Sequence, residues 1–282
     1  MEQLLAIFEP SSEEQNLNDE YDLIVIGGGS AGLTAAAFGI QLGLRVALVE
    51  KHRIGGDCTW TGCVPSKTLI KAARVAHQMR SADRFGLTPV QPEVDLKAVM
   101  EHVGSVVTDV YQEESPEALR ADGIDVYLGS ARFIDPHSLA VGDTVLSGRR
   151  FLIATGAHPF IPPIPGLDEV DYLTYENIWD LEELPRHLLV VGAGPIGCEM
   201  SQAFRRLGAE VTLLDAESRL LPRDDAEASR VLATVFEAEG IALRLGTPVD
   251  RVWQDRDAKV YLLAGGQKVV GDALLLAVGR RP

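Results

Sequence analysis

The residues that most directly suggest chemistry are two cysteines, Cys58 and Cys63, which lie five positions apart. Gly62 precedes the second cysteine, and Pro65 occupies the expected first turn of a helix that follows. A thiol at the N-terminus of a helix is held partly as thiolate, which is the reactive form. Because the surrounding segment is a glycine-rich turn and not a core helix, we interpret the pair as reactive thiols.

Zinc binding is an alternative use for such a pair. Cys58, Cys63 and His52 would make only three ligands, and the C-x-x-C spacing of structural zinc sites is absent. We therefore predict no metal site in the chain.

The number of cysteines bears on the compartment. The chain has three, too few for a secreted scaffold stapled by disulfides, and an odd number leaves at least one unpaired. We therefore expect a reducing, cytoplasmic location, in which any disulfide is catalytic. The third cysteine, Cys198, follows a glycine-rich motif among Ile196, Met200 and Ala203, and we interpret it as a core residue.

Two copies of a G-x-G-x-x-G motif predict nucleotide binding. The glycines and the acidic residue that closes each copy are Gly27, Gly29, Gly32 and Glu50 in the first and Gly192, Gly194, Gly197 and Asp215 in the second. Every landmark recurs 165 positions later, and each acid lies 18 residues after the last glycine of its copy. One such motif is weak, but two copies in the same strand-helix-strand context predict two dinucleotide sites.

Each residue type in the motif has a physical task. The first glycine allows the tight turn, the second lets the backbone approach a pyrophosphate, and the third lets helix and strand pack closely. The helix N-terminus presents free N–H groups and partial positive charge to the phosphates. Glu50 and Asp215, each at the end of a second strand, can accept hydrogen bonds from ribose hydroxyls.

The elements that position these residues form a repeat. We expect strands over residues 21–26 and 46–49 with a helix ending near Gly43, and strands over 188–191 and 211–214 with a helix ending near Gly208. Each unit continues into short alternating segments and then an apolar strand, within residues 151–156 or 274–279. The sequence therefore predicts an α/β fold with two Rossmann-like βαβ domains, each with a parallel sheet plus a small antiparallel β-meander.

The expected domain limits follow from this repeat. We assign residues 1–20 to an acidic tail, 21–157 to the first domain, 158–186 to a linker that contains a proline-rich segment, and 187–282 to the second domain. The first domain also carries an amphipathic helix ending near Arg80 and a helical pattern from about Asp95 to Ala121.

Charge and hydropathy exclude several classes of protein. The 26 basic and 41 acidic residues give a formal net charge of −15, which argues against nucleic-acid binding. The acidic start, with no Lys or Arg in its first twenty residues, is unlike a signal peptide. The 22 residues between Asp22 and Arg45 are uncharged, but the glycines among them favour a strand that turns into a helix over a membrane span.

Taken together, these motifs resemble those of the class I pyridine nucleotide-disulfide oxidoreductases, which include glutathione reductase, dihydrolipoamide dehydrogenase and mercuric reductase. The resemblance covers residues 21–282 and rests on five motifs: G-G-G-S-A-G at Gly27 to Gly32, G-G-D-C-x-x-x-G-C-V-P-S-K at Gly55 to Lys67, A-T-G at Ala154 to Gly156, G-A-G-P-I-G-C-E at Gly192 to Glu199, and A-V-G-R-R-P at Ala277 to Pro282. It implies FAD in the first domain and a nicotinamide nucleotide in the second.

The resemblance also implies roles for particular residues. Electrons would pass from NAD(P)H through flavin to a Cys58–Cys63 disulfide, with Cys63 next to the flavin and Cys58 exchanging with substrate. Lys67 and Glu199 match a lysine-glutamate pair near the flavin, where a cation stabilises arriving negative charge. The residues assigned to cofactor binding are Gly27, Gly29, Ser30, Ala31, Gly32, Glu50, Gly56, Thr155, Gly156, Gly192, Gly194, Ile196, Gly197, Asp215 and Gly279.

Substrate and assembly are expectations of the same kind. Asp215, with Glu217, favours NADH over NADPH because both acids would repel a 2′-phosphate. In the family, a C-terminal domain forms a homodimer interface and supplies a His-Glu pair, and the chain resembles about the first three-fifths of such a subunit. We expect a small-molecule or lipoyl-type disulfide or dithiol as substrate. Mercuric ion is the alternative, and a non-catalytic flavin- or nucleotide-binding module is a further one.

Overall fold

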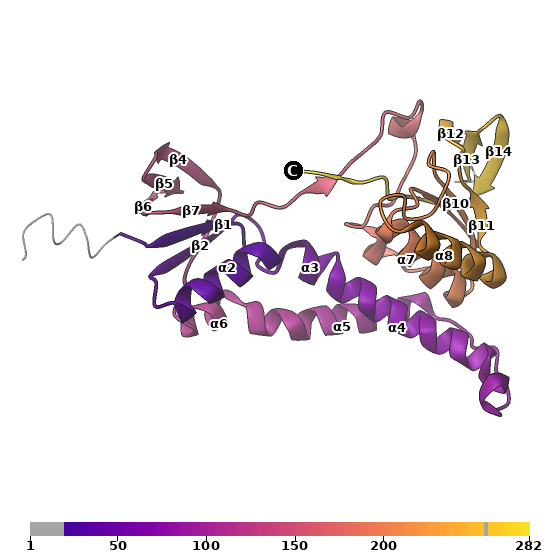
Figure 1. Ribbon diagram of the computed structural model, residues 1–282, viewed down its shortest axis with the longest axis horizontal. Helices are drawn as coiled ribbons and strands as arrows, with labels where there is room; N and C mark the ends of the chain where they lie inside the picture. The colour runs from indigo at the N-terminus through magenta and orange to yellow at the C-terminus, as the bar shows by residue number, and fades with distance from the viewer. Residues whose placement is uncertain (1–19, 257–258) are drawn as a thin grey trace, which may run out of the picture. The chain divides into compact units, whose positions relative to one another are not determined.

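The computed structural model describes residues 20–256 and 259–282, so the expected acidic tail lies outside the described residues except for Glu20. The described chain divides into two compact units (Figure 1). Unit 1 extends to Cys58 and includes Val110–Gly156, and unit 2 comprises Thr59–Asp109 and Ala157–Pro282. The predicted fold class is confirmed, because each unit contains a four-stranded parallel sheet and a three-stranded antiparallel meander.

The parallel sheet of unit 1 has the strand order β3-β2-β1-β7. Its strands are β1 (Leu23–Ile26), β2 (Val46–Glu50), β3 (Asp125–Leu128) and β7 (Phe151–Ile153). Helix α2 (Ser30–Gln41) connects β1 to β2, and the parallel register places Leu23 opposite Val46. The meander consists of β4 (Ala131–Asp135), β5 (Ser138–Val141) and β6 (Thr144–Ser147).

Side-chain alternation gives the sheet of unit 1 two buried faces. Val25 and Leu48 pack with α2 and with helix α6 (Pro116–Ala121), whereas Ala47 and Val49 pack with the meander. Strands buried on both faces have largely apolar sequences: all five residues of β2 are buried, and Val46–Val49 are apolar. The sheet therefore lies between helices and meander, with the carboxyl ends of its strands free to form a ligand site.

Unit 2 repeats this arrangement. Its sheet, in the order β11-β10-β9-β15, consists of β9 (His187–Val191), β10 (Glu210–Leu214), β11 (Ala242–Arg244) and β15 (Ala273–Leu276). Leu188 and Val190 pack with helices, and Leu189 and Val191 pack with the meander. The helices are α7 (Pro195–Leu207) and α8 (Ala226–Glu239), and the meander strands are β12 (Val249–Gln254), β13 (Val260–Ala264) and β14 (Gln267–Gly271).

The segment after the first cysteine packs with unit 2, which differs from the expected domain limits. Helix α4 (Cys63–Arg80) lies against α7, and its Leu69 and Ala73 are buried in the core that α7 shares with the sheet. The unit boundary passes through α3 (Gly56–Trp60) and α5 (Leu96–Glu114). Residues 59–109, which the sequence analysis assigned to the first domain, therefore belong to unit 2.

The segment expected to be a linker, residues 158–186, also belongs to unit 2. It contains β8 (His158–Pro159) and the 3₁₀ turns η2 (Leu167–Glu169) and η3 (Ile178–Asp180). Leu167 and Ile178 are buried, each in one of the two hydrophobic cores of unit 2. The segment therefore contributes residues to the hydrophobic cores of unit 2 and is not only a linker.

Two further features refine the expectations. The helix predicted over residues 95–121 is interrupted, because the Ser115 hydroxyl caps α6 by accepting a hydrogen bond from the Ala118 N–H at 3.2 Å and Pro116 begins the new helix. Among the described residues, every helix is too short or too polar to cross a membrane.

Candidate functional site

The two glycine turns have backbone conformations that only glycine adopts easily. Gly27 has φ +109°, and a Cβ there would lie 2.2 Å from the carbonyl oxygen of Ala154. Gly192 has φ +112°, and its Cβ would lie 2.4 Å from the carbonyl oxygen of Ala277. The two turns therefore have the same geometry at the carboxyl ends of the first strands of their sheets.

The helices that follow the turns are open at their N-termini. Gly29 precedes α2 and Gly194 precedes α7, and no side chain among the described residues caps either helix. A Cβ on Gly194 would meet nothing within 4 Å, so space is present where a phosphate would approach. Uncapped N–H groups and open space fit a dinucleotide pyrophosphate. Ser30, Ala31 and Ile196 lie in the first turns of these helices, as predicted.

The acid that closes each motif is hydrogen-bonded to its own glycine turn. One Glu50 oxygen accepts from the Gly28 N–H at 2.7 Å, and the other accepts from the His52 N–H at 2.7 Å. The Asp215 oxygens likewise accept from the N–H groups of Ala193, at 2.5 Å, and Glu217, at 2.8 Å. Each carboxylate therefore stabilises its own glycine turn. The spacing of 18 residues alone did not predict this role.

The segment that leads to the first cysteine is anchored to the first glycine turn. Gly55 donates its N–H to the Gly28 carbonyl at 2.8 Å and forms an isolated bridge with Gly29. Gly56 packs so closely that a Cβ there would lie 2.7 Å from the Gly29 Cα. Because Cys58 is two residues after Gly56, these contacts with the first glycine turn also fix the position of the Cys58 backbone.

Three further residues predicted to bind cofactor follow the last strands of the parallel sheets. Thr155 and Gly156 follow β7, and Gly279 follows β15. Gly156 and Gly279 have positive φ values of 73° and 129°, and a Cβ on either would meet nothing within 4 Å. These backbone segments lie beside the glycine turns of their own sheets, because β7 pairs with β1 and β15 pairs with β9.

The three cysteines have different surroundings. Cys58 is half-buried in α3, and Cys63 is exposed as the first residue of α4. Cys198 is buried, and burial raises the pKa of its thiol to about 12. The interpretation of Cys198 as a core residue is therefore confirmed.

Lys67 and Glu199 are brought together within unit 2. The Lys67 Nζ lies 2.8 Å from both carboxylate oxygens of Glu199, so the pair joins α4 to α7. The side chains are 61% and 39% exposed, and an ion pair this accessible contributes at most about 1 kcal/mol to stability. With Arg206 they line a cavity of about 280 Å³ between the two helices.

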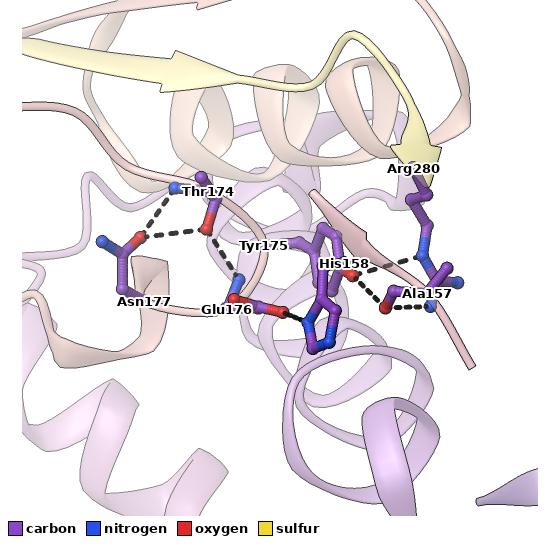
Figure 2. A network of polar contacts seen from close by, with 7 residues as sticks. All are labelled: Ala157, His158, Thr174, Tyr175, Glu176, Asn177 and Arg280. Atoms are coloured by element: carbon purple, nitrogen blue, oxygen red, sulfur yellow. Dashed lines mark hydrogen bonds and ion pairs between the residues drawn. The ribbon is translucent and has the colours of Figure 1, made fainter. Parts of the chain in front are cut away.

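A polar network that the sequence did not reveal joins the start of the Ala157–Pro282 segment of unit 2 to its last residues (Figure 2). The Tyr175 hydroxyl donates to the Ala157 carbonyl at 3.2 Å and accepts from the Arg280 Nε at 3.2 Å. His158 Nδ1 lies 3.2 Å from a Glu176 oxygen. The network lies beside the antiparallel pair of β8 and β16 (Arg280–Arg281). The two arginines of the A-V-G-R-R-P motif therefore form a strand that pairs with β8.

Within residues 20–256 and 259–282, no group of three or more His, Cys, Asp or Glu side chains could hold an ion.

Comparisons with known proteins agree with this geometry. A sequence model of the family described as pyridine nucleotide-disulphide oxidoreductase matches residues 21–282. The chain is 38% identical to a mercuric reductase from Bacillus cereus, over 95% of this chain and 43% of that protein. It is 36% identical to a dihydrolipoyl dehydrogenase from Thermus scotoductus, over 93% of this chain and 58% of that protein.

A solved structure supports the same relationship. The HOCl-induced flavoprotein disulfide reductase RclA from Escherichia coli, solved as a Cu(II) complex, superimposes with a TM-score of 0.80 at 32% identity, covering 93% of this chain and 57% of that one. The chain spans about half the length of the curated relatives it matches. By motif, fold and sequence similarity, the chain belongs to the class I pyridine nucleotide-disulfide oxidoreductase family.

Proposed function

We propose that the whole protein is an FAD-dependent oxidoreductase that passes electrons from a pyridine nucleotide to the Cys58–Cys63 pair and then to a disulfide or dithiol substrate. The observation that carries this proposal is the anchoring of the first thiol segment to the first nucleotide turn, through the 2.8 Å hydrogen bond from Gly55 to Gly28. A first thiol anchored to the glycine turn that would hold FAD suits electron transfer between the flavin and the thiols. An inert thiol pair needs no such connection.

The residues of unit 1 suit FAD. The uncapped N-terminus of α2 would hold the pyrophosphate, and Glu50 would accept from ribose hydroxyls beside the N–H groups that it already binds. Gly156 and Thr155 would bring backbone close to the cofactor. When bound, FAD would relay two electrons between the nicotinamide and the dithiol.

The residues of unit 2 suit a nicotinamide nucleotide, and we propose NADH. Asp215 follows β10 directly and accepts from the Glu217 N–H at 2.8 Å, and we expect the carboxylates of both residues to lie near the adenosine ribose. Two negative charges disfavour a 2′-phosphate. Arg219 donates one guanidinium N–H to the Pro222 carbonyl at 2.6 Å, and its Nη1 has no hydrogen-bond partner among the described residues.

The chemical step that we propose for the thiols balances as a two-electron exchange. The Cys58 thiolate attacks a substrate disulfide, one substrate sulfur leaves as a thiol after taking a proton, and Cys63 displaces the second thiol by forming the Cys58–Cys63 disulfide. Two electrons from NADH return that disulfide to two thiols. Lys67 would stabilise negative charge that accumulates beside α4 during the return step.

Assembly and location are part of the same proposal. We propose a homodimer for the full-length subunit, with the proton donor for the leaving thiol supplied by the C-terminal part found in family members. A cytoplasmic location would keep the dithiol in the reducing environment that a catalytic pair needs.

Mercuric ion reduction is a second candidate, favoured by the 38% identity to the Bacillus cereus mercuric reductase. Thiolates are the ligands that soft metal ions prefer, so the same two cysteines could hold mercury as substrate. Steady-state turnover by the full-length subunit with NADH separates the candidates. We expect a lipoyl-type or other small disulfide to be reduced, whereas turnover with Hg(II) alone would support the second candidate. A purified protein without flavin and without either activity would contradict both.

A further inference from the structure

The connection between the two cysteines is short and is held from a distant part of the chain. Helix α3 ends at Trp60 and α4 begins at Cys63, so only Thr61 and Gly62 lie between them. The Trp179 indole Nε1 donates to the Thr61 carbonyl at 3.1 Å, across 118 positions of sequence. Both residues belong to unit 2.

The Trp179 side chain is itself firmly placed. The same indole N–H is shared with the Tyr175 carbonyl at 2.7 Å, and the ring packs against the core that contains α7 and Leu69. The turn before it is closed by the Asn177 side-chain oxygen, which accepts from the Thr174 N–H at 2.6 Å (Figure 2). The Tyr175 hydroxyl is bonded to Ala157 and Arg280. Trp179 is therefore held by contacts within unit 2, and its indole N–H restrains the Thr61 carbonyl.

We infer that Trp179 is a positioning residue for the dithiol, because its indole N–H fixes the Thr61–Gly62 connection and so sets where the Cys63 thiol stands at the start of α4. This inference rests on the proposed function, in which Cys63 faces the flavin. A carbonyl held two residues before Cys63 restricts the backbone that orients its Sγ. Electron transfer and thiol exchange both depend on that orientation.

The Thr61 side chain provides an internal control. Its hydroxyl oxygen is buried and has no hydrogen-bond partner among the described residues, unlike its carbonyl. Thr61→Val removes this hydroxyl and keeps the carbonyl that Trp179 binds. Because an unpartnered buried hydroxyl contributes no hydrogen bond, its removal leaves the connection in place.

The decisive variant is Trp179→Phe, which removes the N–H and keeps an aromatic ring in the core. Trp253→Phe is the matched control, since Trp253 stacks on Tyr261 in the meander, at 5.3 Å between ring centroids, away from the cysteines. Each variant of the full-length subunit is measured in three ways: hydrogen exchange of the Thr59–Cys63 amides in the protein as purified, the long-wavelength thiolate-to-flavin absorption after one equivalent of NADH, and steady-state kcat and KM.

We expect Trp179→Phe to speed exchange of the Thr59–Cys63 amides several-fold, to weaken the long-wavelength band, and to lower kcat for the disulfide about fivefold, the factor for one hydrogen bond of about 1 kcal/mol, while KM for NADH stays unchanged. Thr61→Val and Trp253→Phe should match the wild type. A Trp179→Phe protein with wild-type exchange and band, or controls that change as much as it does, would overturn the inference. A wild-type protein without the band would contradict the proposed function instead, and the exchange measurement would still decide whether Trp179 holds the connection.

Discussion

Lys67 on α4 binds both carboxylate oxygens of Glu199 on α7 at 2.8 Å, so the helix that begins with Cys63 is tied by charge to the helix that follows the second glycine turn. Lys67 lies four residues after Cys63, and Glu199 lies two residues after Gly197. The pair thus connects α4 to α7 inside unit 2. Because both side chains are exposed, the pair contributes little to stability.

Replacing this lysine should affect electron transfer more than folding. Lys67→Met removes a cation that stabilises arriving negative charge, so we expect flavin reduction by NADH to slow by at least about tenfold, with a change in unfolding free energy below about 1 kcal/mol. Stopped-flow absorbance and thermal unfolding measure the two effects. Arg149→Met, which breaks a comparably exposed pair with Asp22 in unit 1, is the control and should leave the flavin rate unchanged. Equal slowing in both variants would contradict the role of Lys67.

The nucleotide preference can be measured directly. We expect a higher kcat/KM with NADH than with NADPH, because Asp215 and Glu217 place two carboxylates at the end of β10. Steady-state kinetics with both nucleotides would decide, and a clearly higher kcat/KM for NADPH would show the assignment to be wrong.

Glu50 should matter to the fold of unit 1 and to flavin retention together. Its buried carboxylate accepts two backbone N–H groups, and a glutamine at this position would turn an NH₂ group toward one of them. We expect Glu50→Gln to cost about 1–3 kcal/mol of unfolding free energy and to lower the FAD content of the purified protein. Glu93→Gln, at an exposed position, should change neither quantity in denaturant unfolding or flavin absorbance. Full flavin retention together with wild-type stability in Glu50→Gln would rule out the proposed role of the carboxylate.

Cys198 should stay unreactive over a wide pH range. Its buried thiol has a pKa raised to about 12, so the folded state keeps the proton while an unfolded thiol loses it above about pH 9. The contribution of Cys198 to the free energy of unfolding is therefore constant below about pH 9 and falls as the pH rises from 9 toward 12. Alkylation at pH 8 followed by peptide mass analysis should label Cys63 and spare Cys198. Labelling of Cys198 at a comparable rate would contradict its burial.

Much of this architecture could be predicted from short-range patterns. Glycines at 27 and 192 must adopt positive φ, and the strands around them are short apolar runs, so local sequence was enough to locate both turns. The break at Ser115–Pro116 also had a local signal, since the residue before proline disfavours helix, but amphipathic periodicity on both sides obscured it. Local rules therefore predicted the first βαβ unit of each domain and its last apolar strand, but not α8, β3 or β11.

The remainder depends on contacts between distant residues. Nothing near Thr61 indicates that Trp179 will reach its carbonyl, and nothing near Tyr175 indicates Arg280. The packing of α4 on α7, which puts Thr59–Asp109 in unit 2, likewise follows from burial of Leu69 and Ala73 against a helix more than a hundred residues away. The roles of Lys67 and Glu199 were expected only through the family resemblance.

The most direct test of the central claim is the visible spectrum of two variants of the full-length subunit, each with bound flavin and no added reductant. Cys58→Ser leaves Cys63 as the thiol at the start of α4, whereas Cys63→Ser removes it. If Cys63 faces the flavin and Cys58 exchanges with substrate, Cys58→Ser should show the long-wavelength thiolate-to-flavin band and Cys63→Ser should show none. Identical spectra for the two variants, or the band in Cys63→Ser alone, would contradict the account.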